Sequence, residues 1–356
     1  MCVFCETVTF SSPYFSLLNC VADTLQKLGK IQHLRGNYID CISAYNEALR
    51  LRQANLQDSS HPGIILLLSL LMEAYILIER FQSALQCLSA ILFSYKEFMG
   101  PHNEKVIELL IKKCHIHTLM GKHSAAMAFA MEALTLCKEC DKDKDSSQLI
   151  RALAFEEIAF VYEKQIKLLK AIEWHKKAFN LRISILEHSD PLVTKSAVNI
   201  AETHCLRGEF QHAKSILKES RNKCRLAFGL EHSSVADILD KLGSVYFEQK
   251  AFNSAIKHHM KAIEIRKQCT HNWHAEVADS MYCIGVALSR KGRRREAMDH
   301  FSSVLQMYRM AHYTSSHPKV ITTIRSMTDF RHIEDELETS TVFSSGTKFV
   351  ISMAEA

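Results

Sequence analysis

The residues of this chain best suited to metal chemistry are two pairs of cysteines. Cys2 and Cys5 form one CxxC pair, and Cys137 and Cys140 form a second. Four thiolates at this spacing can bind zinc when the two pairs meet in space. The pairs are far apart along the chain, so we interpret each as structural or incidental rather than as half of a shared site.

A cluster of acids offers the next candidate, a calcium loop. Asp141, Asp143 and Asp145 have the spacing of the first three ligands of an EF-hand. That loop also needs a glycine at its sixth position and a bidentate glutamate at its twelfth. Ser146 and Ala152 stand there instead, so the sequence predicts a solvated insertion and no calcium site.

A third cluster, Cys269, His271 and His274, lies at a junction between repeated segments, and we interpret it as incidental. Phosphate-binding GxxxxGK[ST], zinc-binding HExxH, nucleophile-elbow GxSxG and dinucleotide-binding GxGxxG sequences are all absent. Each of these patterns places specific catalytic or cofactor-binding groups. The sequence therefore predicts a protein that is not an enzyme, with no cofactor, no bound metal and no small-molecule substrate.

One run of basic residues could contact an acidic partner. It comprises Arg290, Lys291, Arg293, Arg294 and Arg295, with Gly292 in the middle. The whole chain has 44 basic and 39 acidic residues, a net charge of +5 that is too mild to imply a nucleic-acid partner. We interpret the run as a solvated turn. The alternative is contact with nucleic acid or an acidic membrane surface.

A seven-fold pattern of small residues predicts the elements that carry these side chains. Its first members are Gly29, Met72, Cys114, Ala159, Ala201, Gly243 and Gly285. Twelve residues after each follow Cys41, Ala84, Ala126, Ala171, Ala213, Ala255 and Ala297. Successive units are 42 to 45 residues apart, and self-similarity at such a period is typical of a solenoid.

Each unit divides into two predicted helices. In the sixth, residues 233–249 and 252–265 carry apolar side chains at three- and four-residue steps. Glycines mark the turn between the two helices in four units: Gly36, Gly121, Gly208 and Gly292. Proline suits the first position of a helix, and it follows a junction residue in His61-Pro62 and Asp190-Pro191 between units and in His317-Pro318 before the capping helix.

These units resemble the tetratricopeptide repeat family. Leu242-Gly243 and Tyr246 match its first helix, and Phe252, Ala255 and Ala262 match its second. The 42-residue period, the His-Pro junction and endings such as Ala262-Ile-Glu-Ile-Arg266 resemble the kinesin light chain subtype. The resemblance implies an all-α, right-handed solenoid of about seven helix-turn-helix repeats with a C-terminal capping helix. We assign residues 1–15 to an N-terminal extension, 16–338 to the solenoid and 339–356 to a flexible tail.

The resemblance also implies where a partner would bind. The first helix of each repeat lines the concave wall of such a solenoid. Asparagines of this helix hold the backbone of cargo peptides in kinesin light chains, and Asn199 matches them, whereas Lys241 and Cys283 occupy that position in the next two units. The expected groove residues are Lys112, His115, Glu156, Phe160, Lys195, Asn199, Glu202, Lys241, Ser244 and Tyr282.

The sequence therefore predicts a non-enzymatic adaptor that binds a peptide or helix of a protein partner. A regulatory subunit whose basic turn contacts nucleic acid or acidic membrane is the alternative. A repeat region of a larger regulated enzyme is a third interpretation. The most apolar run, 63–78, is too short to span a membrane. Twelve cysteines without a secretory signal indicate reduced thiols in the cytosol or nucleus, and we predict a cytoplasmic protein.

Overall fold

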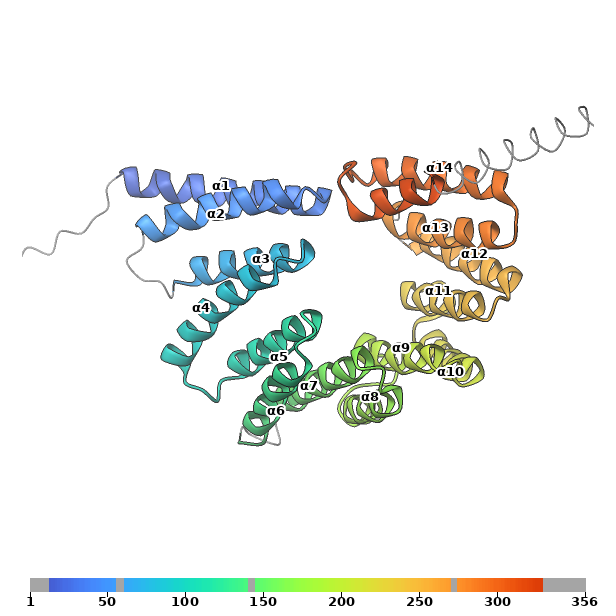
Figure 1. Ribbon diagram of the computed structural model, residues 1–356, viewed down its shortest axis with the longest axis horizontal. Coiled ribbons are helices and arrows are strands. Elements are labelled where there is room, and N and C mark those ends of the chain that lie inside the picture. Colours follow the sequence, from blue (N-terminus) through green and yellow to red (C-terminus); the bar gives the residue numbers. More distant parts are fainter. Residues whose placement is uncertain (1–12, 56–60, 140–144, 270–273, 329–356) are drawn as a thin grey trace, which may run out of the picture. The chain divides into compact units, whose positions relative to one another are not determined.

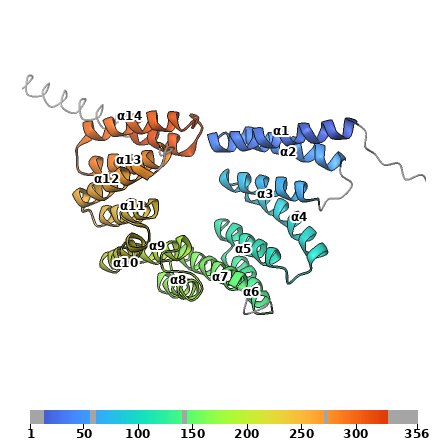
Figure 2. The same cartoon turned by 180° about the vertical axis from the view of Figure 1, so that it is seen from behind.

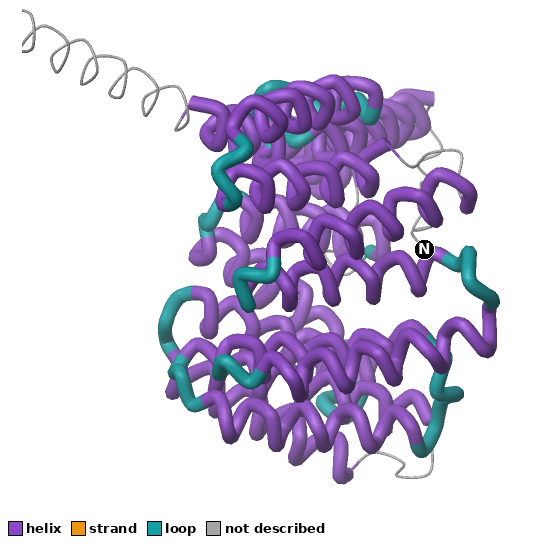
Figure 3. Tube along the Cα trace, turned by 90° about the vertical axis from the view of Figure 1, so that its right-hand side faces the viewer, coloured by secondary structure: helices purple, strands orange, loops and turns teal. Residues whose placement is uncertain are grey.

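The computed structural model describes residues 13–55, 61–139, 145–269 and 274–328 (Figure 1). These residues form helices and connecting turns, without a strand (Figure 3). The helices are α1 (Pro13–Arg35), α2 (Tyr38–Asn55), α3 (Pro62–Leu77), α4 (Phe81–Met99), α5 (Glu104–Leu119), α6 (His123–Glu139), α7 (Asp145–Lys164), α8 (Leu168–Ile183), α9 (Pro191–Leu206), α10 (Phe210–Phe228), α11 (Ser233–Glu248), α12 (Phe252–Cys269), α13 (His274–Arg290) and α14 (Arg294–Met310).

Each predicted repeat is one pair of helices, from α1 and α2 to α13 and α14. The chain divides into two compact units, residues 1–216 and 217–356. In the N-terminal unit, α3 and α5 lie on one side of the stack, and α4 and α6 lie on the other (Figures 1 and 2). Helix α5 packs against its own partner α6 and against α7 of the next repeat. The predicted all-α solenoid of helical pairs is confirmed.

The small residues of the seven-fold pattern lie where paired helices pack. The second member of each repeat, from Cys41 to Ala297, is fully buried. At three first members, glycine leaves room for a ring from the paired helix. A Cβ atom on Gly243 would lie 2.6 Å from Nε2 of His259, and one on Gly285 would lie 2.7 Å from Cε1 of Phe301. The small residues of the pattern are therefore found both where a ring of the paired helix packs and where two helices approach closely.

Histidines at the junctions between repeats cap the helices that follow. In His61, His232 and His317, the ring Nδ1 accepts a hydrogen bond from the backbone N–H two residues later, at 3.1, 3.2 and 3.2 Å. The carboxylate of Asp190 accepts the equivalent bond at 2.7 Å. A side-chain acceptor here satisfies a helix N–H that would otherwise lack a partner. Burial lowers the pKa of His317, which keeps that ring neutral and able to accept.

The turn inside each repeat requires one residue with positive φ. The four predicted glycines adopt φ between +73° and +85°. Glu79, Ile166 and Lys250 occupy the same place in three other repeats, with φ of 59°, 61° and 61°. L-residues other than glycine, asparagine and aspartate rarely adopt this left-handed conformation. The turn is therefore set by the packing of the two helices, even where the sequence disfavours it.

Replacing Ile166 by glycine tests this conclusion. The side chain of Ile166 is 82% exposed, so its removal sacrifices little packing. The left-handed conformation costs an L-residue about 1–2 kcal/mol, whereas glycine loses about 0.5–1 kcal/mol of chain entropy. We expect Ile166→Gly to raise the free energy of unfolding by about 0.5–1 kcal/mol in urea denaturation. Ile166→Ala, which keeps the Cβ atom, is the control, and an equal gain from both variants would contradict the argument.

Some predicted features lie at the limits of the described residues. Helix α1 begins at Pro13, and a further helical segment, 318–328, begins where the capping helix is predicted. The remainder of that helix, the tail, the first CxxC pair, Cys140, the acids at 141 and 143 and His271 lie outside the described residues. Among the helices that are described, none has an apolar stretch sufficient to cross a bilayer.

Candidate partner-binding face

Side chains of α5 and α7 meet at matching positions of two successive repeats. The rings of His115 and Phe160 stack with centroids 5.2 Å apart and an interplanar angle of 18°. His115 Nδ1 lies 3.0 Å from Oε2 of Glu157, and this hydrogen bond raises the pKa of His115. Lys164 places its Nζ 5.1 Å from the centre of the Phe160 ring. The result is a partly exposed aromatic patch bordered by positive charge.

Helix α9 adds further polar groups to the N-terminal unit. Lys195 and Glu202 are exposed, and Asn199 is half-buried. The Asn199 side-chain amide donates to Oε1 of Glu156 on α7 at 3.2 Å. Lys112, on α5, is exposed. Of the predicted residues in this unit, His115 and Phe160 touch each other, as do Glu156 and Asn199.

Glu156 differs from the sequence-based expectation that it faces a partner. Its side chain is only 10% exposed, and it forms an ion pair with Arg182 of α8. Arg182 donates to both carboxylate oxygens, with Nη2 2.9 Å from Oε2, and also donates to the hydroxyl of Ser196 on α9. The carboxylate therefore joins three helices instead of meeting a ligand. Its contact with Asn199 holds that amide in place.

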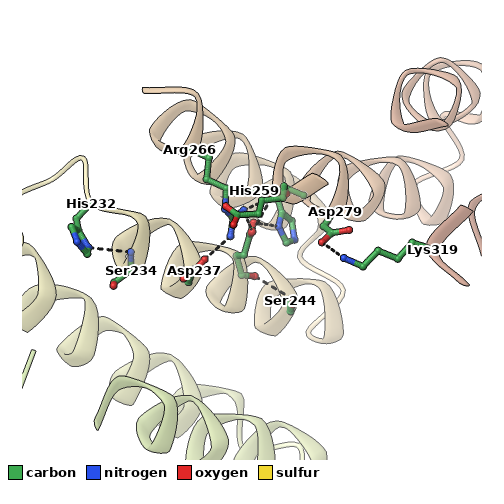
Figure 4. Close-up of polar contacts among 11 residues, drawn as sticks. His232, Ser234, Asp237, Ser244, His259, Arg266, Asp279 and Lys319 are labelled. Atoms are coloured by element: carbon green, nitrogen blue, oxygen red, sulfur yellow. Dashed lines mark hydrogen bonds and ion pairs between the residues drawn. The ribbon is translucent and has the colours of Figure 1, made fainter. Parts of the chain in front are cut away.

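The C-terminal unit contains an equivalent network around Arg266 of α12 (Figure 4). Arg266 donates to Asp240 and Asp237 of α11 and to the Ser280 hydroxyl of α13, the last two at 2.7 and 2.6 Å. His259 Nδ1 lies 2.8 Å from Asp240 Oδ1. Burial by itself would raise the pKa of Asp240, but the hydrogen bond to His259 and the charge of Arg266 outweigh it, and that pKa is lowered.

Arg182 and Arg266 occupy the same place in the repeat pattern, because they lie two periods of 42 residues apart. Arg52 of α2 is a third case, donating to Asp23 of α1 at 2.5 Å and to the Gly63 carbonyl of α3 at 2.7 Å. An arginine at the end of a second helix thus links the first helices of two successive repeats. The arginines at 52 and 266 belong to the repeat endings that the sequence shows. The acidic side chains that pair with these arginines are not apparent from the sequence.

The remaining predicted groove residues belong to the C-terminal unit. Lys241 and Ser244 are exposed on α11, and the Ser244 hydroxyl donates to the Asp240 carbonyl at 3.2 Å. The Tyr282 hydroxyl lies 3.0 Å from that of Ser326 in segment 318–328. Tyr282 therefore contacts the terminal helical segment, which occupies part of the surface that the sequence assigns to a partner.

The basic turn at the start of α14 is exposed but partly neutralised. Arg290, Lys291, Arg293 and Arg295 are exposed, and Arg294 is half-buried. Lys291 donates to the Asn253 side chain at 2.7 Å, and Arg293 pairs with Glu296 at 2.5 Å. Lys291 and Arg293 are therefore engaged within the protein, and the Arg293–Glu296 ion pair offsets one positive charge of the turn.

Repeats of the chain match a known protein family. A family model described as tetratricopeptide repeat matches residues 195–268 and 234–310. Residues 195–310 are tetratricopeptide repeats. Tetratricopeptide repeats form a scaffold for contacts between proteins, and a fold of this kind does not itself supply catalytic groups. No curated protein sequence matches the chain.

Solved structures resemble this chain in fold at low sequence identity. BtubC (BKLC) from P. vanneervenii aligns with a TM-score of 0.51 and 16% identity, over 66% of this chain and 91% of that one. A Rap protein complexed with Competence and Sporulation Factor has a TM-score of 0.51 and 12% identity, over 84% and 80%. A putative kinesin light chain from Podosopora anserina has a TM-score of 0.46 and 15% identity, over 58% and 96%. At these identities the likeness concerns the fold alone.

Proposed function

We propose that this chain is a non-enzymatic cytoplasmic adaptor that binds an acidic segment of a partner protein along α5, α7 and α9, as kinesin light chains bind cargo peptides. The observation that carries the proposal is the stacked pair His115 and Phe160. It places an aromatic surface across two successive first helices. Helical-repeat proteins use such surfaces to hold peptides.

The charge around this surface favours an acidic partner. Lys112, Lys164 and Lys195 are exposed on the three helices. Glu157 is engaged by His115, which offsets part of its negative charge. Positive side chains at the rim of a binding surface raise the rate of association with acidic partners and disfavour basic ones.

The orientation of the Asn199 side chain is fixed by contacts within the protein, and this favours peptide binding. Its amide is held by Glu156, which is held in turn by the buried Arg182. A binding group whose orientation is set before the ligand arrives loses less conformational entropy on binding. The solved Rap protein, of similar fold, is complexed with Competence and Sporulation Factor, and this precedent supports ligand binding by the fold.

Affinity purification with the tagged full chain tests the proposal. We expect wild type to recover a specific protein, and Lys195→Glu to weaken its binding about five- to tenfold by charge repulsion. Asn199→Ala should weaken the same interaction. Lys176→Glu, an equal charge change at an exposed site on α8, is the matched control.

Two outcomes would count against the adaptor. One is recovery of no specific protein; the other is equal recovery by wild type and Lys195→Glu. Nuclease treatment and a salt series separate the alternative function. Binding through the basic turn would be lost with Arg294→Glu and Arg295→Glu and would fall steeply with ionic strength.

A further inference from the structure

Three potential metal ligands converge at the turn between α9 and α10. They are His204 in the last turn of α9, Glu209 in the turn, and His212 in the first turn of α10. One nitrogen or carboxylate oxygen from each lies within 4.8 Å of those of the other two. The three residues serve no role in the proposed binding face.

The backbone brings these side chains together. Gly208 adopts φ of +79° and reverses the chain after α9. The Glu209 N–H then donates to the His204 carbonyl at 2.9 Å, which closes the turn. As a result, the His204 and His212 rings face each other with centroids 5.5 Å apart and an interplanar angle of 24°. The convergence is thus a property of the fold at this turn and does not depend on a distant contact.

Two of the three side chains are already held in position. His204 is 8% exposed, and its Nδ1 lies 2.6 Å from Glu209 Oε2. The other carboxylate oxygen, Oε1, lies 2.9 Å from Nη1 of Arg207. Groups that orient a ligating carboxylate are a regular feature of metal sites. His212 is exposed, so its ring can adjust to an ion.

We propose that His204, Glu209 and His212 bind a divalent d-block ion, of which zinc is the best match. Two imidazole nitrogens and one carboxylate oxygen form a donor set that zinc accepts, with the remaining positions available to water. Ligand atoms around tetrahedral zinc are about 3.4 Å apart, given bonds of about 2.0–2.1 Å. His204 Nδ1 and Glu209 Oε2, now 2.6 Å apart, must separate by about 0.8 Å, and the exposed His212 ring must turn toward them, to reach that geometry. The ion then takes the place of the hydrogen-bonded proton between His204 and Glu209.

The spacing of these residues explains why the sequence alone does not predict the site. His-x₄-Glu-x₂-His is not a familiar zinc pattern, and its ligands are split between two helices by a glycine turn. Familiar helical motifs place their ligands one turn apart on a single helix. Only the reversal at Gly208 brings these three together.

Calorimetric titration of the metal-free full chain with Zn²⁺, with Co²⁺ as a spectroscopic probe, tests the proposal. We expect His212→Ala and Glu209→Gln each to weaken binding at least about tenfold, while both variants keep the wild-type circular dichroism. His188→Ala, at an exposed histidine of the same unit, should bind as wild type does.

The cysteines of the chain offer a competing source of ligands, and the Co²⁺ spectrum distinguishes them. Nitrogen and oxygen donors give weak visible bands, whereas thiolates add strong near-ultraviolet charge-transfer absorption. Visible bands lost in His212→Ala would support the site. Equal binding by wild type and His212→Ala, a thiolate spectrum in both, or no binding at all would overturn it.

Discussion

Replacement of Arg182 by methionine is expected to lower the free energy of unfolding by about 3–5 kcal/mol. Arg182 is 1% exposed and donates to both oxygens of Glu156. Methionine keeps much of the side-chain volume but leaves the carboxylate buried, with hydrogen bonds only from Ser196 and Asn199. An uncompensated buried charge costs more than the original pair contributes.

The measurement must detect local as well as global unfolding, because stacked repeats mainly contact their neighbours. Urea denaturation followed by circular dichroism gives the total loss. Amide hydrogen exchange shows whether α7, α8 and α9 open first. The surface pair of Arg293 and Glu296, with side chains 48% and 49% exposed, provides the control. Arg293→Met should cost less than about 1 kcal/mol.

A second substitution identifies the cause of the loss. If the cost arises from the unpaired carboxylate, Arg182→Met combined with Glu156→Gln should recover much of the stability, because the remaining amide is neutral. The same double variant should disturb Asn199, so partner binding need not recover with it. A loss for Arg182→Met no greater than that for Arg293→Met would contradict the role of the buried pair.

The repeated fold was predictable from the sequence because the same small residues recur at the same helical positions. Packing of one repeat needs only its own residues and those of its neighbours, so a periodic pattern predicts the helical pairs directly. The glycine turns and the residues preceding proline added independent signals, and both are present at the predicted places.

The repeat pattern does not predict whether an individual charged residue is buried or exposed. Glu156 and Lys195 both fall on the predicted wall, yet one is buried and the other exposed. The difference depends on Arg182, which lies 26 residues beyond Glu156 on another helix. Helical periodicity predicts the face of a helix on which a residue lies. Whether a charged residue on that face forms an ion pair across repeats depends on the long side chain at the end of the neighbouring helix. The ring that fills the space beside Gly285 is likewise contributed by another helix.

Gly285→Val is expected to lower the free energy of unfolding by about 3 kcal/mol. A Cβ atom there would lie 2.7 Å from Cε1 and 3.0 Å from Cδ1 of Phe301, closer than packing allows. The Phe301 ring is fully buried and lies 5.6 Å from the Tyr282 ring, so it has little room to withdraw. The low helix propensity of glycine would favour the substitution by under about 1 kcal/mol, which the clash exceeds.

A double-mutant cycle with Phe301→Ala separates the clash from other effects. Phe301→Ala alone should cost about 3–5 kcal/mol, because it leaves a cavity beside Gly285. In the double variant the valine side chain enters that cavity, so the clash disappears and part of the lost packing returns. The combined loss in urea denaturation should then fall short of the sum of the single losses by about 2 kcal/mol. Strict additivity would mean that Gly285 is small for a reason other than the ring opposite it.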